Sequence, residues 1–82
     1  MNTYLFYIEY DGRKTVSHGY DVPVETMVAD SINHAARQFA EKNKVKKVKL
    51  DQLDEKDYRV FFEKKSLLVK PQELVYFVQV NY

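Results

Sequence analysis

The hydrophobic and polar positions along this chain change their period, and that change predicts the architecture. From residue 2 to residue 28, and again from residue 47 onward, apolar residues tend to alternate with polar ones, as in strands that bury one face. Between these stretches apolar residues recur three and four positions apart, the spacing of one buried stripe on a helix. The stripe consists of Ile32, Ala35, Ala36, Phe39 and Ala40. The pattern therefore predicts one helix between two sets of strands.

The helix is predicted over Asp30–Asn43. The carboxylate of Asp30 suits an N-cap, because it can accept from free N–H groups of the first turn at the positive end of the helix dipole. At the other end, Asn43 is predicted to adopt the left-handed conformation that commonly follows a helix. A second interpretation starts the helix near Pro23–Glu25. It ranks lower because the valines there, Val22, Val24 and Val28, favour a strand.

Two strands are predicted before the helix. In the first, residues 2–10, one face carries Tyr4, Phe6, Ile8 and Tyr10, and the other carries Leu5 and Tyr7. Apolar residues on both faces indicate an inner strand, or a second surface that a partner covers. Asp11 and Gly12 then predict a two-residue type I′ hairpin turn.

The second strand is predicted from Lys14 towards Val28. Its inward row is expected to be Val16, His18, Tyr20, Val22, Val24 and Val28. Gly19 and Pro23 interrupt this row, so a bend or bulge is expected, with an edge position around Pro23.

Three strands are predicted after the helix: Lys47–Asp51, Tyr58–Lys65 and Leu74–Tyr82. Their inward residues are expected to be Val48 and Leu50, then Tyr58, Val60 and Phe62, then Leu74, Tyr76, Val78, Val80 and Tyr82. The chain is thus predicted to be one α+β domain over residues 1–82, in the order ββαβββ, with one helix on one face of a mostly antiparallel sheet. This order of elements resembles the ubiquitin-like β-grasp arrangement. The chain ends Val80-Asn81-Tyr82 without a Gly-Gly tail, so the resemblance does not imply conjugation.

Composition restricts the classes of function. The chain has 82 residues, enough for one small core, and no cysteine, which excludes disulfides, thiolate metal sites and a cysteine nucleophile. No apolar run reaches the length of a membrane span, and no signal-peptide pattern follows Met1. These features predict a cytoplasmic protein with no membrane contact.

No constellation of residues predicts catalysis, a cofactor or a metal. The two histidines, His18 and His34, have no partner at metal-ligand spacing. Ser17 cannot pair with His18 as nucleophile and base, because neighbours on a strand point to opposite faces. The protein is therefore predicted not to be an enzyme.

The leading functional prediction is a non-catalytic binding protein that acts through a protein–protein interface. One helix covers one sheet face, so apolar residues of the opposite parity are expected to leave a Tyr/Phe-rich patch open. They are Leu5, Tyr7, Phe61, Val75 and Phe77. Such a protein would be an inhibitor or adaptor, or would pair with itself as a dimer. Its size and lack of catalytic residues also resemble small phage-encoded host-interaction proteins.

A run of lysines supports an alternative, weak nucleic-acid binding. The run consists of Lys42, Lys44, Lys46, Lys47 and Lys49. Lysines of this kind bind phosphate backbones, but they also keep a strand edge from pairing with other strands. The acidic residues that follow, Asp51, Asp54, Glu55 and Asp57, are expected to cancel much of the field. A third alternative is an accessory subunit of a larger enzyme.

Overall fold

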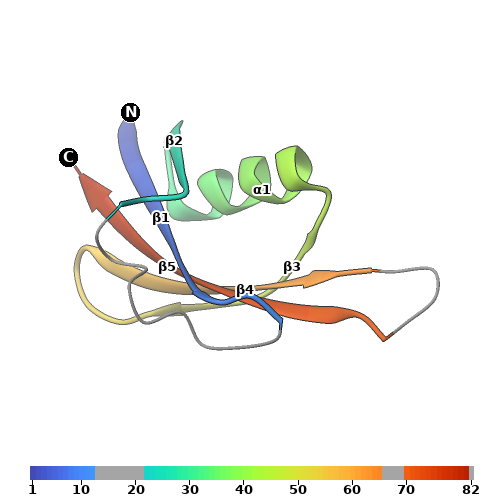
Figure 1. Ribbon diagram of the computed structural model, residues 1–82. Coiled ribbons are helices and arrows are strands. Elements are labelled where there is room, and N and C mark those ends of the chain that lie inside the picture. The colour runs from blue at the N-terminus through green and yellow to red at the C-terminus, as the bar shows by residue number, and fades with distance from the viewer. Residues whose placement is uncertain (13–21, 66–69, 82) are drawn as a thin grey trace.

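The computed structural model describes residues 1–12, 22–65 and 70–81 (Figure 1). In sequence order the elements are β1 (Asn2–Tyr10), β2 (Glu25–Ala29), α1 (Ile32–Asn43), β3 (Lys46–Gln52), β4 (Asp57–Lys64) and β5 (Gln72–Asn81). The helix lies on one face of the sheet (Figure 1). The α+β class and the ββαβββ order are confirmed.

The five strands form one sheet in the order β2-β1-β5-β4-β3, with antiparallel pairing between all neighbours. β1 is an inner strand between β2 and β5, which is the first of the two interpretations of its apolar faces. The likeness to the β-grasp arrangement is confined to the order of elements. In this chain β1 and β5 pair antiparallel, with Tyr4 opposite Val80.

The predicted helix stripe is confirmed, and Phe39 lies at its centre. Ala35 and Ala36 are fully buried, and their small side chains let α1 lie close to the sheet. The ring of Phe39 contacts three aromatic rings of the sheet, at centroid distances of 4.6 Å to Phe6, 4.9 Å to Phe62 and 4.7 Å to Tyr76. The main core is therefore an aromatic cluster between α1 and strands β1, β4 and β5.

Both predicted helix caps are wrong by one residue. Ser31 is the N-cap, because its Oγ accepts from the backbone N–H of His34 at 3.1 Å. Asp30 lies one residue before this position and does not cap the helix. Lys44, with φ of 56°, takes the left-handed position, and its N–H donates to the carbonyl of Ala40. Asn43 stays helical, and its Nδ2 donates to the Phe39 carbonyl at 3.0 Å.

The predicted inward row of the second strand is also wrong within the described residues. Met27 and Ala29 face the core at 8% and 2% exposure. Val22, Val24 and Val28 are instead exposed, at 72%, 51% and 54%. The register with β1 determines which residues of β2 face the core, because Met27 lies opposite the buried Tyr4. A shift of one residue would exchange the two faces of the strand. The predicted part at 14–21, with Val16, His18, Gly19 and Tyr20, lies outside the described residues.

The register of β2 also excludes the predicted hairpin turn. A two-residue turn at Asp11 and Gly12 would place residue 17 opposite Phe6, and Glu25 occupies that position. Gly12 has φ of +92°, but Asp11 is not among the described residues with positive φ, and a type I′ turn needs both. The pairing of β2 with β1 therefore overrides the local turn signal.

The inward-facing residues predicted for the later strands are confirmed in the described parts of β4 and β5. In β3 the prediction is wrong at one residue, Val48. Val60, Phe62 and Val78 are fully buried. Leu50 packs against the core, whereas Val48 is 58% exposed, because the pairing of β3 with β4 shifts between Lys47 and Lys49. Tyr82, predicted to end the last strand, and residues 66–69 lie outside the described residues.

Candidate functional site

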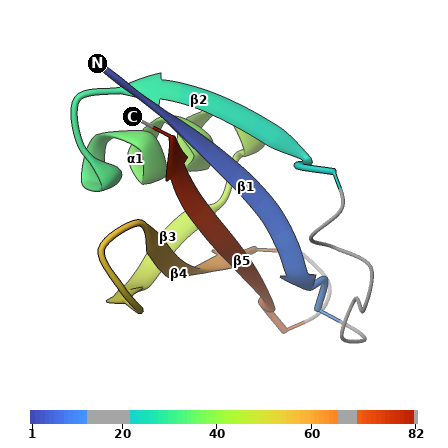
Figure 2. The same cartoon turned by 90° about the vertical axis from the view of Figure 1, so that its left-hand side faces the viewer.

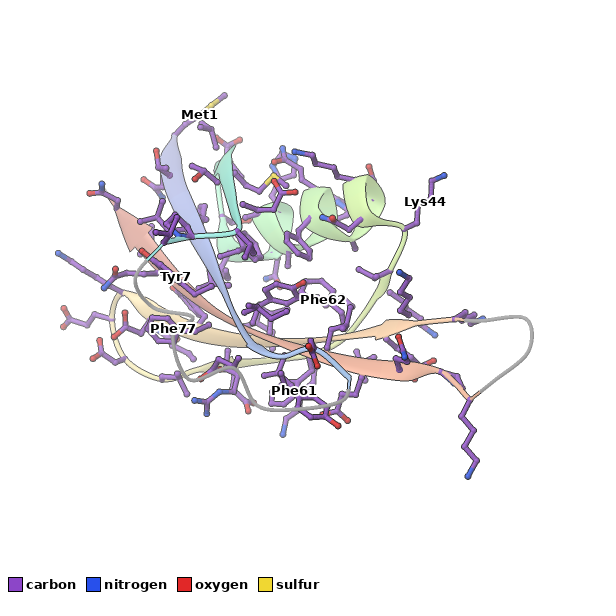
Figure 3. The ribbon with its side chains drawn as sticks, in the orientation of Figure 1. Met1, Tyr7, Lys44, Phe61, Phe62 and Phe77 are labelled. Atoms are coloured by element: carbon purple, nitrogen blue, oxygen red, sulfur yellow. The ribbon has the colours of Figure 1, made fainter. Side chains whose placement is uncertain are left out.

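The five residues predicted to form an interface do share the helix-free face of the sheet. Tyr7 lies directly opposite Phe77 across β1 and β5, and Phe61 lies opposite Val75 across β4 and β5. Figure 3 shows Phe61 on the side of the sheet away from the neighbouring Phe62. Leu5 lies two residues from Tyr7 on β1 and therefore has the same orientation.

The expectation that this patch stays open is wrong. Tyr7 and Val75 are each only 9% exposed, and Leu5, Phe61 and Phe77 are half-buried. The residues of this face pack on one another: the rings of Tyr7 and Phe77 have centroids 6.2 Å apart, and the Nζ of Lys49 lies 5.6 Å from the Phe61 ring centroid. These five residues therefore form a second, largely buried apolar layer and not an open surface.

A charged pair on the same face was not predicted. Arg59 on β4 donates from Nε to Glu9 Oε1 at 2.7 Å and from Nη2 to Oε2 at 3.2 Å, across the intervening strand β5. The two side chains are 38% and 15% exposed. Fifty positions separate them in the sequence, so no local pattern signals the pair. It makes this face polar at its centre, which weakens the case for an apolar interface there.

The two edges of the sheet differ in how they are protected. The β3 edge carries exposed lysines and an interrupted pairing, two devices that stop a strand edge from recruiting another strand. The lysines are Lys46, Lys47 and Lys49. The β2 edge has neither device: it pairs with β1 at five consecutive positions, and no lysine occurs in Glu25–Ala29.

Three of the six exposed large hydrophobic residues of the described chain lie in β2 or just before it: Val22, Val24 and Val28. Thr26 and Val28 of β2 are exposed and alternate with the buried Met27 and Ala29, so they share the helix-free face. Val24, also exposed, precedes the strand, and its backbone N–H donates to the carbonyl of Phe6 at 2.8 Å. No strand of the described residues pairs with the outer side of β2, which is the outermost strand in Figure 2. Sequence reasoning missed this region because it assigned the valines to the core.

The predicted basic run does not form a single patch. Lys42 donates to Glu25 at 3.0 Å, Lys49 pairs with Asp51 at 3.6 Å, and Lys44 caps the helix. The other two, Lys46 and Lys47, line an open cleft of about 700 Å³ between α1 and the start of β3. The complete lining is Ser31, Asn33, His34, Arg37, Ala40, Val45, Lys46 and Lys47.

This cleft is more basic than the sequence indicated. Its lining includes Arg37 and His34, which were not in the predicted site, and no carboxylate. Of the acidic residues expected to cancel the lysines, Asp51 lies within β3 and pairs with Lys49, and the other three lie beyond the far end of the strand. About six residues of strand, the length from Lys46 to that end, span roughly 20 Å. That exceeds two screening lengths of about 8 Å at physiological salt. The cancellation expected from those three residues is therefore weak at Lys46 and Lys47, although Glu63 of β4 lies directly opposite Lys46.

The described residues offer little else in the way of site chemistry. Within 1–12, 22–65 and 70–81 there is no group of three or more side chains that could hold a metal ion. His34 lies with its Nε2 3.3 Å from Gln38 Nε2 on the surface of α1. Burial raises the pKa of the Tyr76 hydroxyl, and nearby Glu25 and Asp11 raise it further. This tyrosine belongs to the core cluster.

Two further observations bear on the class of protein. No helix in the described ranges is long and apolar enough to cross a membrane. Comparison with protein families, curated proteins and solved structures finds no match for this chain.

Proposed function

We propose that this protein is a non-catalytic binding module that contacts another protein through the outer edge of β2. The observation that carries the proposal is the contrast between the two edges of the sheet. β3 carries exposed lysines, whereas β2 is regular and free of lysine. Val28 within β2 and Val24 just before it are both more than half exposed.

A strand edge of this kind binds by strand addition. An extended segment of a partner pairs with the free backbone groups, and its alternate side chains contact those of the edge strand. Here the contacted side chains would be Thr26 and Val28, with the exposed Val24 just before the strand. Exposed apolar side chains gathered in one place commonly mark an interface, while single ones scattered over a surface do not.

The proposal is compatible with several biological settings. The module would act as an inhibitor or adaptor, as in the host-interaction proteins that phages encode, or as an accessory subunit of a larger enzyme. We place it in the cytoplasm, because a chain without cysteine needs no oxidising compartment.

Two matched variants test the proposal. Val28→Lys puts a charge on the β2 edge, and Val48→Lys puts the same charge on the β3 edge at nearly the same exposure, 54% against 58%. Tagged wild type and variants are used to capture partners from a native lysate of the source organism, treated with nuclease. Val28→Lys is expected to lose the captured protein and Val48→Lys to keep it. Capture at full strength by a folded Val28→Lys variant would refute the proposal.

The basic cleft favours a second candidate function, the binding of phosphate backbones. Arg37, Lys46 and Lys47 project from two elements around one cleft without a carboxylate among its lining. This candidate ranks second because affinity for nucleic acid grows with the number of phosphates that lysines and arginines neutralise, and two of the five lysines of the run pair with acidic residues instead.

A salt titration tests this second candidate. We expect wild type to bind no oligonucleotide with a sub-micromolar dissociation constant at physiological salt. If such binding occurs, and replacing Arg37, Lys46 and Lys47 together by glutamine weakens it and flattens its salt dependence, the cleft is a nucleic-acid site and the ranking is reversed.

A further inference from the structure

Two cationic side chains reach the cleft between α1 and β3 from different elements. Lys47 lies opposite Phe62 of β4, whose ring packs on the helix, so the side chain of Lys47 extends towards α1. There its Nζ donates to Asn33 Oδ1 at 3.3 Å, and both residues line the cleft together with Arg37. Asn33 and Arg37 are four residues apart and therefore lie on the same side of α1. The cleft thus combines an ammonium from β3 with a guanidinium from the helix.

The protein leaves both of these cations unneutralised. None of the ion pairs between described residues involves Arg37 or Lys47, and no carboxylate belongs to the lining of the cleft. Lys47 uses one of its N–H donors on Asn33 and keeps the others, and the guanidinium of Arg37 carries several donors in a planar fork. The contact with Asn33 also holds the ammonium in place before any ligand arrives. The cleft therefore offers positive charge and free donors to an anion.

The charge, size and floor of the cleft define the class of anion. We infer that it binds a small molecule that carries one phosphate monoester group beside an apolar or planar body. A phosphate monoester has a charge of about −1.5 to −2 at pH 7, which matches one arginine and one lysine. The volume of about 700 Å³ lies within the range of about 300–1,000 Å³ typical of small-molecule sites. The half-buried Ala40 and Val45 supply the apolar part of the lining, against which the body of the ligand would pack.

The residues around the cleft favour such a compact anion over a nucleic-acid strand. Elsewhere on α1, Lys42 pairs with Glu25 at 3.0 Å, and at the start of β3 Lys46 lies opposite Glu63 of β4. The positive charge on these two sides is therefore offset by acidic residues, and no continuous basic track leads away from the cleft there. A nucleic-acid backbone gains affinity from many phosphates neutralised along its length, whereas a single phosphate group needs only local donors.

Titration with phenyl phosphate, followed by proton–nitrogen correlation NMR, tests the inference. The same spectra report binding, its location and the fold of the protein. At low salt we expect a dissociation constant of about 1 mM or below. The largest shifts are expected at the backbone N–H groups of residues that line the cleft: Asn33, His34, Arg37, Val45 and Lys47. Unchanged cleft resonances at about 10 mM phenyl phosphate would overturn the inference.

A pair of charge-matched double variants shows whether the site is specific. Arg37→Gln with Lys47→Gln removes both cations of the cleft, and Lys44→Gln with Lys70→Gln removes the same charge from exposed positions outside its lining. The first pair is expected to weaken phenyl phosphate binding about tenfold or more, because each lost cation donates a charge-assisted hydrogen bond. The second pair is expected to bind nearly as wild type does. Equal weakening by both pairs would show that net charge alone attracts the ligand, and would overturn the site.

Related probes test the class of ligand. Inorganic phosphate lacks the apolar body and benzenesulfonate carries a single negative charge, so each is expected to bind about fivefold or more weakly than phenyl phosphate. Equal affinity for inorganic phosphate would overturn the assigned body, and equal affinity for benzenesulfonate would overturn the preference for a phosphate monoester. A tyrosine-phosphorylated peptide is expected to bind no more tightly than phenyl phosphate, and much tighter binding would assign the cleft to phosphorylated proteins instead.

The remaining outcomes separate this inference from both candidate functions. An oligonucleotide that binds far more tightly than phenyl phosphate through Arg37 and Lys47 would assign the cleft to nucleic acid and overturn the inference. The inference goes beyond the proposed function, because the cleft is a different site from the β2 edge. Partner capture by Val28→Lys decides the proposed function whatever the titrations show.

Discussion

Truncation of Phe39 to alanine tests the central packing of the fold. The side chain is 2% exposed and is the only member of the helix stripe that brings an aromatic ring into the core. It contacts Phe6, Phe62 and Tyr76, so its removal leaves a cavity bordered by three strands.

The expected loss is large for a domain of this size. Replacing a buried phenylalanine by alanine costs about 3–5 kcal/mol, from lost transfer free energy and the cavity left behind. Aromatic pairs add about 0.5–1.5 kcal/mol each beyond burial, so three of them place Phe39 near the top of that range, at about 4–5 kcal/mol. A domain of 82 residues has about 4–12 kcal/mol of stability in total. Phe39→Met, which keeps most of the volume, is expected to cost about 1–1.5 kcal/mol.

Urea denaturation followed by circular dichroism measures these differences. With a slope of about 1 kcal/mol per molar urea for a small domain, each 1 kcal/mol moves the midpoint by about 1 M. The control is Gln38→Ala on the neighbouring, half-buried side of α1, expected to change stability by less than about 0.5 kcal/mol. Equal midpoints for Phe39→Ala and Gln38→Ala would show that the stripe does not face the core.

Three smaller perturbations test other features. Lys44→Gly should raise the free energy of unfolding by about 0.5–1 kcal/mol, because glycine adopts the left-handed conformation without strain; a loss of stability would contradict this. The raised pKa of Tyr76 means that its contribution to stability is present below about pH 10, the pKa of an unperturbed tyrosine, and is lost as pH rises through the higher folded value. Tyr76→Phe should therefore reduce the alkaline loss of stability, and an unchanged pH profile would refute this. Arg59→Met should cost about 1 kcal/mol at low salt and less at about 1 M salt, where screening is strong. An equal cost at both salt concentrations would show that the ion pair with Glu9 contributes nothing.

The spacing of hydrophobic residues correctly predicted the buried faces of the helix and of the inner strands. The stripe around Phe39 and the rows containing Phe6, Phe62 and Val78 are buried as expected, since each combines a clear period with large apolar residues. Helix ends were less accurate because Asp30 and Ser31 are both good caps, and only the geometry of the first turn selects between them.

The faces of β2 and β3 were not predictable in the same way. Valine has the higher β propensity, which favoured Val24 and Val28 as core residues, yet the register with β1 turns Met27 and Ala29 inward. At Val48 an irregular pairing with β4 breaks the alternation, and no single residue in the sequence signals it.

The candidate site depends on relations between strands that are distant in sequence. The shared face of Tyr7 and Phe77 followed from parity, but the Glu9–Arg59 pair that crosses it did not. The choice of β2 as the interaction edge requires the strand order, because only the order shows which strands are outermost and which of those carries lysines.

The most direct test of binding through β2 is amide hydrogen exchange, resolved by residue, with and without the partner protein captured from the lysate. The outward N–H groups of an edge strand exchange readily, and they become protected when another strand pairs with them. We predict slower exchange within Glu25–Ala29 in the bound state and no change within Lys46–Gln52. Unchanged exchange within Glu25–Ala29 in the bound state would contradict the account.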